Sequence, residues 1–140
     1  MTDIVVTAAQ VGMIFPMKAE VRSYIAYVAI TKGQAVYIRT DGKVAVADAD
    51  GSGTLQFRGI ALNTVGAGDA VDVIHDGELY GFTVAGLNAD SMVYLSNTAG
   101  ALATAAGSTS VVCGRVVCLT DTPTMTKVLR VFTRWSADWA

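Results

Sequence analysis

Two Asp-Gly pairs, each standing between segments of alternating apolar and polar residues, constrain the fold of this chain more than any other feature. The pair Asp41-Gly42 separates residues 37–39 from 43–46, and the pair Asp76-Gly77 separates residues 71–74 from 79–84. Two-residue β-hairpins favour Asp-Gly because glycine adopts the positive φ that the turn requires. The sequence therefore predicts two hairpins, with His75 exposed beside the second turn.

Further short runs rich in β-branched residues predict additional strands. They cover residues 59–63, 92–95, 101–103, 111–119 and 126–132. Short strands at this spacing, separated by glycine and small polar residues, are typical of a β-sandwich or barrel. We therefore expect a small, barrel-like all-β domain, with Tyr37, Val73, Phe82 and Tyr94 in its core.

The chain also contains an internal repeat. Residues 31–38 resemble residues 88–95, and each copy is followed by two glycine-led segments, at 42–45 and 59–62 in the first and at 100–103 and 114–117 in the second. This pattern predicts that a turn, a strand and a hairpin are used twice in one compact barrel. The alternative is chance similarity among strands rich in alanine, valine and glycine.

Residues 1–23 and 133–140 lie outside the repeat, so we expect an N-terminal arm and a C-terminal tail around a domain of residues 24–132. The arm has an apolar stretch in which Pro16 blocks a continuous helix, and the tail holds both tryptophans. Trp is a favoured anchor in buried contacts. The residues predicted to contact a partner protein or a neighbouring subunit are Met13, Ile14, Phe15, Met17, Trp135 and Trp139. The alternative is that both segments fold back on their own domain.

The composition excludes several classes of protein. Hydrophobic residues make up 52% of the chain and charged residues 16%, against about 25% charged residues in ordinary domains. This balance excludes intrinsic disorder and suggests that other subunits cover some apolar surface. The net charge of −2, with Lys and Arg spread singly, argues against a nucleic-acid partner. No apolar run approaches the ~20 residues of a membrane span, and the N-terminus lacks the pattern of a signal peptide.

The two cysteines, Cys113 and Cys118, are five residues apart in one predicted strand. An odd separation places two side chains on opposite faces of a strand. We therefore expect two reduced thiols that do not bond to each other, which fits assembly in a cytoplasm.

The sequence contains no convincing catalytic, cofactor or metal-binding motif. The chain has one histidine and no Gly-x-Ser-x-Gly motif of a nucleophilic serine. The segment Asp48–Gly53 resembles a calcium loop but lacks its later glutamate, so we interpret it as a surface loop. Lys18 lies in the arm and not at the hairpin tip expected of a biotin or lipoyl attachment site. We therefore expect a structural protein without cofactors, and not an enzyme.

The order and spacing of these segments resemble the capsid decoration (cement) proteins of tailed bacteriophages. The resemblance covers residues 3–132 and lies in residues 3–11, 29–37, 41–44, 59–63, 92–95, 114–117 and 128–131. Each of these motifs by itself is common in β-turns and strands. The apolar stretch 12–17 and the Trp-bearing tail depart from the family pattern, which leaves open the segment that contacts the shell.

The resemblance implies a β-tulip domain that binds the outer capsid surface as homotrimers, with the arm reaching over neighbouring subunits and the major capsid protein. It would stabilise the shell against the pressure of packaged DNA, so the expected location is the virion, after assembly in the host cytoplasm. A second hypothesis is another β module of the virion, in the tail or the head–tail connector. A third is a trimeric β-fold nucleotide hydrolase, which would need clustered acidic residues.

Overall fold

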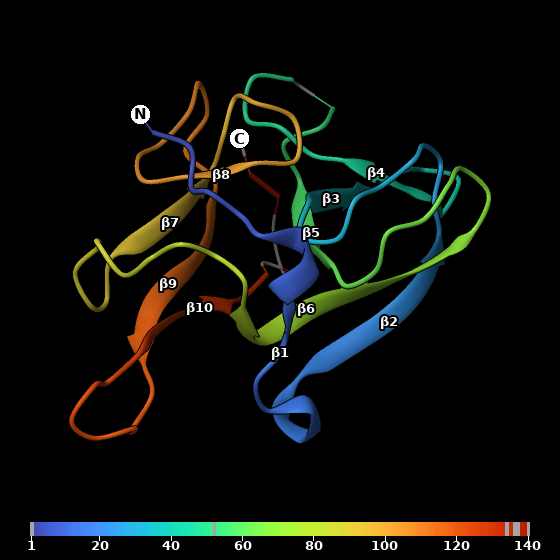
Figure 1. Ribbon diagram of the computed structural model, residues 1–140. Helices are drawn as coiled ribbons and strands as arrows, with labels where there is room; N and C mark the ends of the chain where they lie inside the picture. Colours follow the sequence, from blue (N-terminus) through green and yellow to red (C-terminus); the bar gives the residue numbers. More distant parts are fainter. Residues whose placement is uncertain (1, 52, 134, 136–137, 140) are drawn as a thin grey trace.

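A computed structural model describes residues 2–51, 53–133, 135 and 138–139. The protein is almost entirely β, and its strands form one curled antiparallel sheet with the shape of a half-barrel (Figure 1). The strands are β1 Gly12–Met13, β2 Glu20–Ile25, β3 Ala35–Ile38, β4 Val44–Val46, β5 Phe57–Ala61, β6 Ala70–Tyr80, β7 Met92–Leu95, β8 Leu102–Ala103, β9 Val112–Cys118 and β10 Lys127–Val131. Two 3-10 helices, η1 Ala8–Gln10 and η2 Pro16–Lys18, lie in the N-terminal segment. The expected all-β, barrel-like class is confirmed.

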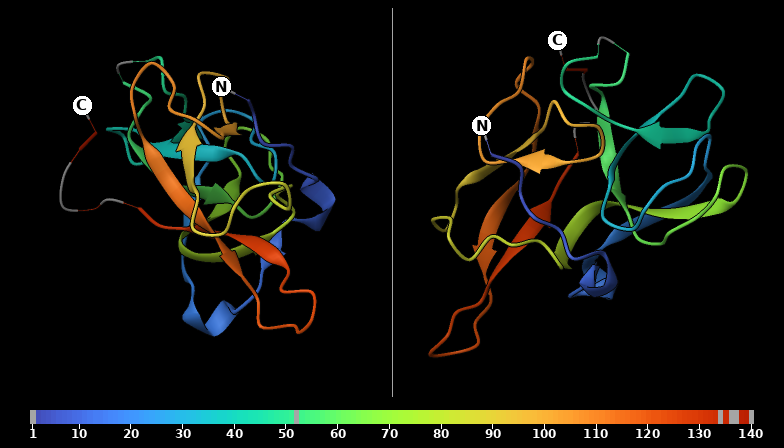
Figure 2. Two further views of the ribbon diagram at one scale, coloured as in Figure 1. Left: turned by 90° about the vertical axis from the view of Figure 1, so that its left-hand side faces the viewer. Right: turned by 45° about the horizontal axis from the view of Figure 1, so that its top comes forward.

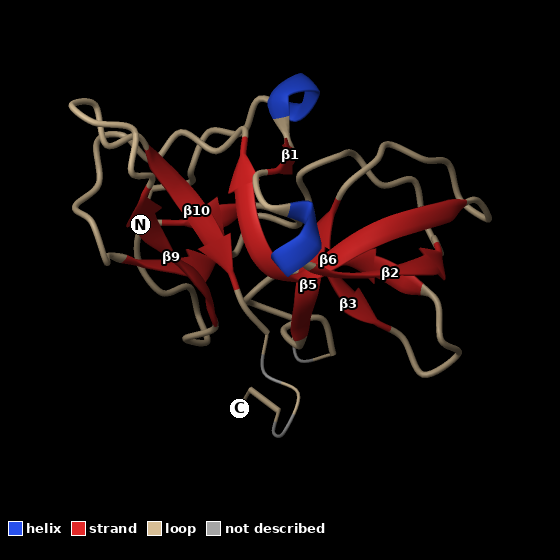
Figure 3. Cartoon of the chain, turned by 90° about the horizontal axis from the view of Figure 1, so that it is seen from below, coloured by secondary structure: helices blue, strands red, loops and turns tan. Residues whose placement is uncertain are grey.

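The long strand β6 organises the sheet. The strand order is β4-β3-β5-β6-β10-β9-β7-β8, and β1 and β2 also pair with β6. The first part of β6 pairs with β2 and β5, whereas its last residues pair with β10 and β1. Figure 3 shows β9 and β10 on one side of β6 and β2 and β3 on the other. β6 therefore joins the two halves of the molecule.

The hairpin predicted at Asp41-Gly42 is present, with Ile38 opposite Val44 in the β3–β4 pair. Gly42 has φ 84°, and the Asp41 carboxylate accepts a hydrogen bond of 3.0 Å from the Lys43 backbone N–H. This bond and the neighbouring Arg39 guanidinium lower the pKa of Asp41. The local turn signal and the tertiary structure agree at this position.

The hairpin predicted at Asp76-Gly77 is wrong, because β6 continues through this pair without a turn. Asp76 is opposite Glu20 of β2, and Gly77 is opposite Val131 of β10. Gly77 is required for a different reason: its φ is 151°, and an added Cβ would lie 2.7 Å from the Ile74 side chain. Glycine at this position permits β6 to change its pairing partner from β2 to β10. The residues before and after Gly77 are therefore both paired with other strands, which a hairpin turn here would prevent.

The internal repeat is confirmed as a structural duplication. The strands β3-β4-β5-β6 and β7-β8-β9-β10 have the same connectivity, and the strand order is mirrored about the contact between β6 and β10. The turn before each repeat has a positive φ at the same place, 95° at Gly33 and 69° at Asp90. The N–H of Gly33 donates to the Ala61 carbonyl (2.9 Å), and the N–H of Asp90 donates to the Val116 carbonyl (2.7 Å).

A pair of glycines also marks the duplication. Gly59 in β5 and Gly114 in β9 occupy equivalent places, opposite Val36 and Val93 respectively. A Cβ on Gly59 would lie 2.4 Å from a carbonyl oxygen of β6, and one on Gly114 would lie 2.2 Å from a carbonyl oxygen of β10. The two glycine-led segments of the sequence repeat therefore have the same packing role.

The described part of residues 1–23 does not extend away from the domain as the expected arm. Ile4 is buried, and its N–H donates to the Leu102 carbonyl of β8 at 2.8 Å. Bridges join Asp3 to Ala103 and Val6 to Phe82, so this segment runs along the edge of β8 (Figure 2). The segment folds back because it covers a strand edge that would otherwise lack hydrogen-bond partners. β2 crosses the predicted 23/24 boundary, so its first residues belong to the sheet.

Two clusters of buried side chains form the core. The larger draws on both halves of the sheet and includes Phe57 and Leu129, and the smaller lies in the half built from β2 to β6. Among the predicted core residues, Val73 is fully buried, whereas Tyr37, Phe82 and Tyr94 are half-buried. Tyr37 and Phe82 pack against the larger cluster. Both cysteines are free, as expected, with Cys113 buried and Cys118 partly exposed. Burial raises the pKa of the Cys113 thiol well above its usual value, so this thiol stays protonated.

Candidate interaction surface

The short turn formed by η2 carries the most exposed apolar side chain of the described residues. Met17 is 100% exposed, and the preceding Phe15 is 45% exposed. Pro16 opens the 3-10 helix because its fixed φ suits a first helical position. The turn closes through the N–H of Lys18, which donates to the Phe15 carbonyl at 2.9 Å. The sequence thus forms a tight projection in place of a continuous helix.

Both ends of this projection are fixed to β6. The N–H of Ile14 donates to the Glu78 carbonyl at 3.0 Å, and Gly12 of β1 is opposite Tyr80. On the other side, β2 begins at Glu20 and pairs with β6. The turn is therefore held by strand pairing before and after it.

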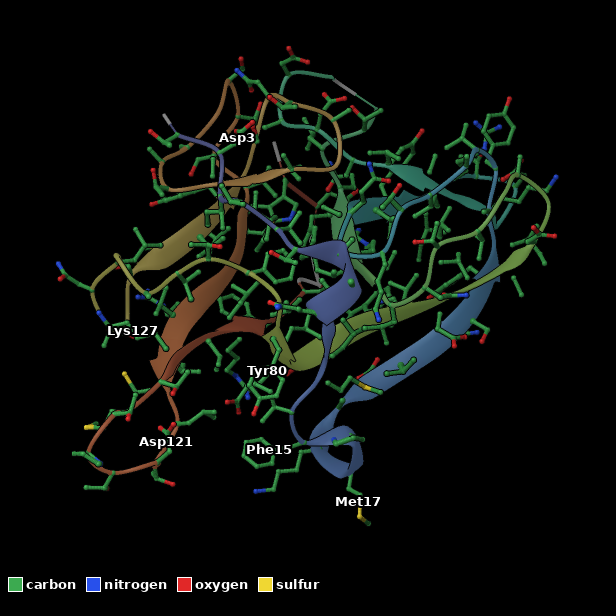
Figure 4. All side chains as sticks on the ribbon, viewed as in Figure 1. Asp3, Phe15, Met17, Tyr80, Asp121 and Lys127 are labelled. Carbon is green, nitrogen blue, oxygen red and sulfur yellow. The ribbon has the colours of Figure 1, made fainter. Side chains whose placement is uncertain are left out.

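Tyr80 extends the apolar surface around the turn. Its side chain is 46% exposed, and in Figure 4 it lies above Phe15, with Met17 below them at the lower end of the molecule. The Lys18 ammonium lies 5.6 Å from the centroid of the Phe15 ring, which places a positive charge beside the aromatic face. We call Phe15, Met17 and Tyr80 the knob surface.

The structure separates the six predicted contact residues. Phe15 and Met17 belong to the knob surface, whereas Met13 and Ile14 are half-buried and Met13 packs against the main core. Trp135 and Trp139 lie at the C-terminal tail and do not join the knob surface. Sequence reasoning missed Tyr80, because it alternates with the expected core residue Phe82 in the predicted strand 79–84. Its exposure follows from its place at the end of β6.

Side chains at the start of β5, Gln56 just before the strand and Arg58 within it, bind the described residues of the C-terminal tail. The Gln56 amide forms two hydrogen bonds with the backbone of Trp139, one from its Nε2 to the carbonyl (2.7 Å) and one to its Oε1 from the N–H (2.8 Å). The Arg58 guanidinium, mostly buried, forms an ion pair of 2.9 Å with Asp138. Trp139 packs against the main core, and Trp135 remains 52% exposed. The tail is thus anchored in its own chain.

His75 is fully buried, so its predicted place at an exposed turn is wrong. The Tyr24 hydroxyl donates to His75 Nε2 at 2.7 Å, and His75 Nδ1 donates to the Arg58 carbonyl. A carbonyl can only accept, so the proton of the neutral imidazole lies on Nδ1. Burial lowers the pKa of His75 and raises that of Tyr24. The Trp135 ring covers the imidazole edge-on, with 4.8 Å between centroids.

The loop at Asp48 is a surface turn in its described residues, as the sequence analysis interpreted it. The Asp48 carboxylate accepts hydrogen bonds from the N–H groups of Asp50 (3.2 Å) and Gly51 (2.9 Å). The Oδ1 atom of Asp48 is thus used within the loop. Across the described residues, no group of three or more His, Cys, Asp or Glu side chains is arranged to hold a metal ion. No helix in the same residues is long and apolar enough to cross a bilayer.

An open groove of about 550 Å³ lies beside β2. Residues 22–25 of β2 form one wall, and Ile38, Gly42, Ala70 and Trp135 complete the lining. The hydrogen-bonded pair of Tyr24 and His75 lies next to this groove. The lining of the groove is chiefly apolar, and Arg22 supplies a positive charge.

These features define a class of protein: an all-β domain with a duplicated half-barrel sheet and an exposed apolar projection. Comparison with models of known protein families and with curated proteins found no match to this chain. The class is therefore defined by the fold and the surface.

Proposed function

We propose that this protein is a structural component of a tailed-phage head, a decoration protein that binds the outer surface of the capsid and stabilises the lattice of the major capsid protein. The observation that carries the proposal is the knob surface, where Met17 is fully exposed and Phe15 and Tyr80 are each nearly half exposed. The resemblance of residues 3–132 to decoration proteins supports it. Assembly into homotrimers on the capsid lattice is part of the proposal and would present three knob surfaces to one lattice site.

The energetic argument rests on burial of these side chains against a partner. Removing a side chain such as Met or Phe from water contributes about 1.5–3 kcal/mol. Two such side chains are not enough for stable binding by one copy, because association itself costs about 4–15 kcal/mol. Several simultaneous contacts on a repeating lattice overcome this cost through avidity. A lattice-bound oligomer therefore suits this surface better than a single small partner does.

The geometry of the knob surface also favours tight contact. Because strand pairing with β6 holds both ends of the turn, Phe15 and Met17 are presented on a fixed backbone. A preorganised surface loses less conformational entropy on binding than a flexible one. The same pairing makes deletion of residues 1–17 a poor test, since it would uncover the edge of β8 and remove the buried Ile4.

Point substitutions test the proposal. Met17→Ser and Phe15→Ser should each lower co-sedimentation with mature, undecorated phage shells, and the double variant should abolish it. Val5→Ser is the matched control, because Val5 is 66% exposed but lies away from the turn. Equal binding by the double variant and the control would contradict the proposal.

The position of the bound protein tests its location on the particle. Electron microscopy of labelled protein should show many copies spread over the shell. A ring of a few copies at one vertex would contradict a decoration role and favour the connector hypothesis. Failure to bind any mature shell would refute the proposed partner altogether.

A further inference from the structure

β2 is a strand with one unpaired edge. Within the described residues it is hydrogen-bonded to β6 over residues 20–25, and its other edge has no strand partner before Ala26. An exposed edge of this length is a template for pairing with another chain unless proline, charge or a bulge protects it. The register shift between β2 and β6 lies between Glu20 and Val21, where His75 of β6 is the extra residue, so residues 21–25 of β2 pair regularly.

The backbone hydrogen bonds establish which groups face the free edge. The N–H of Ala26 donates to Asp69 at 2.9 Å, so residues 22, 24 and 26 direct their backbone groups toward β6. The Asp72 carbonyl accepts from the N–H of Leu62, on the opposite side of β6 from β2. Ser23, which lies opposite Asp72, therefore forms no backbone hydrogen bond with it. The N–H and C=O groups of Val21, Ser23 and Ile25 face outward.

The side chains beside this edge are self-complementary. Consider a second copy of β2 that pairs antiparallel with the first, with Ser23 opposite Ser23 of the second copy. Val21 then lies opposite Ile25, and Arg22 lies opposite the Tyr24 ring. Apolar pairs and cation–aromatic pairs of this kind stabilise neighbouring strands. A register centred on residue 22 would place two Arg22 side chains directly opposite each other, which is unfavourable.

The surroundings of β2 leave space for such a contact. Val21 and Ile25 are 36% and 44% exposed, and the groove runs beside residues 22–25. Tyr27 and Val28, which follow β2, are also exposed and would contribute apolar area. Six strand residues span only roughly 20 Å, so two paired edges of this length bury less than the ~800 Å² per partner of a typical stable complex. The contact is therefore weak in free solution and strengthened where copies are concentrated.

We propose that β2 pairs antiparallel with β2 of a second copy of this chain, in the register centred on Ser23, to form a two-fold contact. This contact goes beyond the shell-binding proposal, because it uses the edge of β2 in place of the knob surface and needs no shell. Where copies are crowded on a surface, it would link neighbouring units into a continuous sheet.

Disulfide trapping tests the register. In a Cys118→Ser background, Ser23→Cys should form a covalent dimer under mild oxidation, because directly opposite hydrogen-bonded residues have Cα atoms about 5.5 Å apart. Val21→Cys or Ile25→Cys by itself should not, since the two copies of either residue would be about 13 Å apart. A mixture of the two should form the heterodimer. Cross-linking of Val21→Cys with itself would overturn the proposal. So would the absence of any cross-link both in Ser23→Cys and in the mixture.

A matched pair of substitutions tests the edge itself. Ser23→Ala removes the hydrogen bond between Ser23 and Asp72 but keeps the outward N–H, whereas Ser23→Pro removes both. The parent and the alanine variant should shift from one chain toward two as concentration rises from about 10 to about 500 µM, and the proline variant should remain a monomer. Sedimentation measures the mass, and thermal unfolding checks the fold.

The remaining outcomes also decide the question. Equal association of the alanine and proline variants would refute pairing through β2. If Ser23→Pro fails to fold, the cysteine mixture alone decides. A monomer at every concentration whose β2 amides gain hydrogen-exchange protection only with phage shells would assign the edge to a different chain and overturn the inference. Loss of shell binding in the knob variants, with the cross-link intact, would affect only the function proposed above.

Discussion

Replacement of Gly114 by alanine tests the reasoning about strand packing most directly. Gly114 lies in β9 opposite Val131 of β10, and β10 passes so close that a Cβ would lie 2.2 Å from the Arg130 carbonyl oxygen. Real Cβ atoms essentially never approach within 3.0 Å of another atom, so the strands must separate by about 0.8 Å. The obstacle is backbone, which cannot rotate away as a side chain can.

The magnitude follows from the hydrogen bonds that this movement stretches. A shift of ~0.8 Å lengthens a bond of about 2.9 Å to about 3.7 Å, beyond the useful range. Loss of two such bonds, each contributing about 0.5–1.5 kcal/mol, lowers the free energy of unfolding by about 1–3 kcal/mol. A chain of this length has a total stability of about 7–21 kcal/mol, so the variant should remain folded.

Urea denaturation measures this change as a lower midpoint with an unchanged slope. Gly12→Ala is the matched control, because nothing lies within 4 Å of the added Cβ, and its stability should change by less than about 0.5 kcal/mol. Gly59→Ala, at the equivalent place in the other repeat, should be at least as destabilising as Gly114→Ala. A Gly114→Ala variant as stable as Gly12→Ala would refute the close-approach argument.

Three further predictions follow from the core, the buried histidine and the tail. Phe57→Ala should lower the free energy of unfolding by about 3–5 kcal/mol in urea titrations, because the ring is fully buried in the main core. Burial lowers the pKa of His75, so the unfolded chain binds its proton more readily. Stability should therefore fall as pH decreases below 6.5, the ordinary pKa of histidine, and His75→Gln should flatten this part of the profile. Gln56→Ala should speed proteolytic removal of the tail, since it deletes both hydrogen bonds to Trp139, whereas Gln10→Ala should not.

Local signals predicted the strands well wherever local and distant contacts favour the same structure. The run Met92–Leu95 is β7 as predicted, and the turn at Asp41-Gly42 forms because its glycine adopts the positive φ that the hairpin needs. The repeat was visible in sequence because each copy needs the same turn, the same strand and a glycine at the same close approach. Each of these requirements acts within a short stretch of chain.

The candidate site was only partly predictable. The exposure of Phe15 and Met17 follows from Pro16, which ends any continuing helix and leaves a tight turn. Tyr80 was missed because its alternation with Phe82 suggested a buried face, whereas the strand ends at Tyr80. Sequence reasoning also could not show that Trp139 is held by Gln56, because these residues are 83 positions apart.

The amino-acid sequence by itself determined the β class, most strand positions and the duplication, because strand patterns and turn residues act over a few neighbouring positions. Only the tertiary structure decided that β6 runs through Asp76-Gly77, that His75 is buried and that the N-terminal segment covers β8. In each case a partner distant in the chain supplies hydrogen bonds or excludes water, and these gains outweigh the local preference.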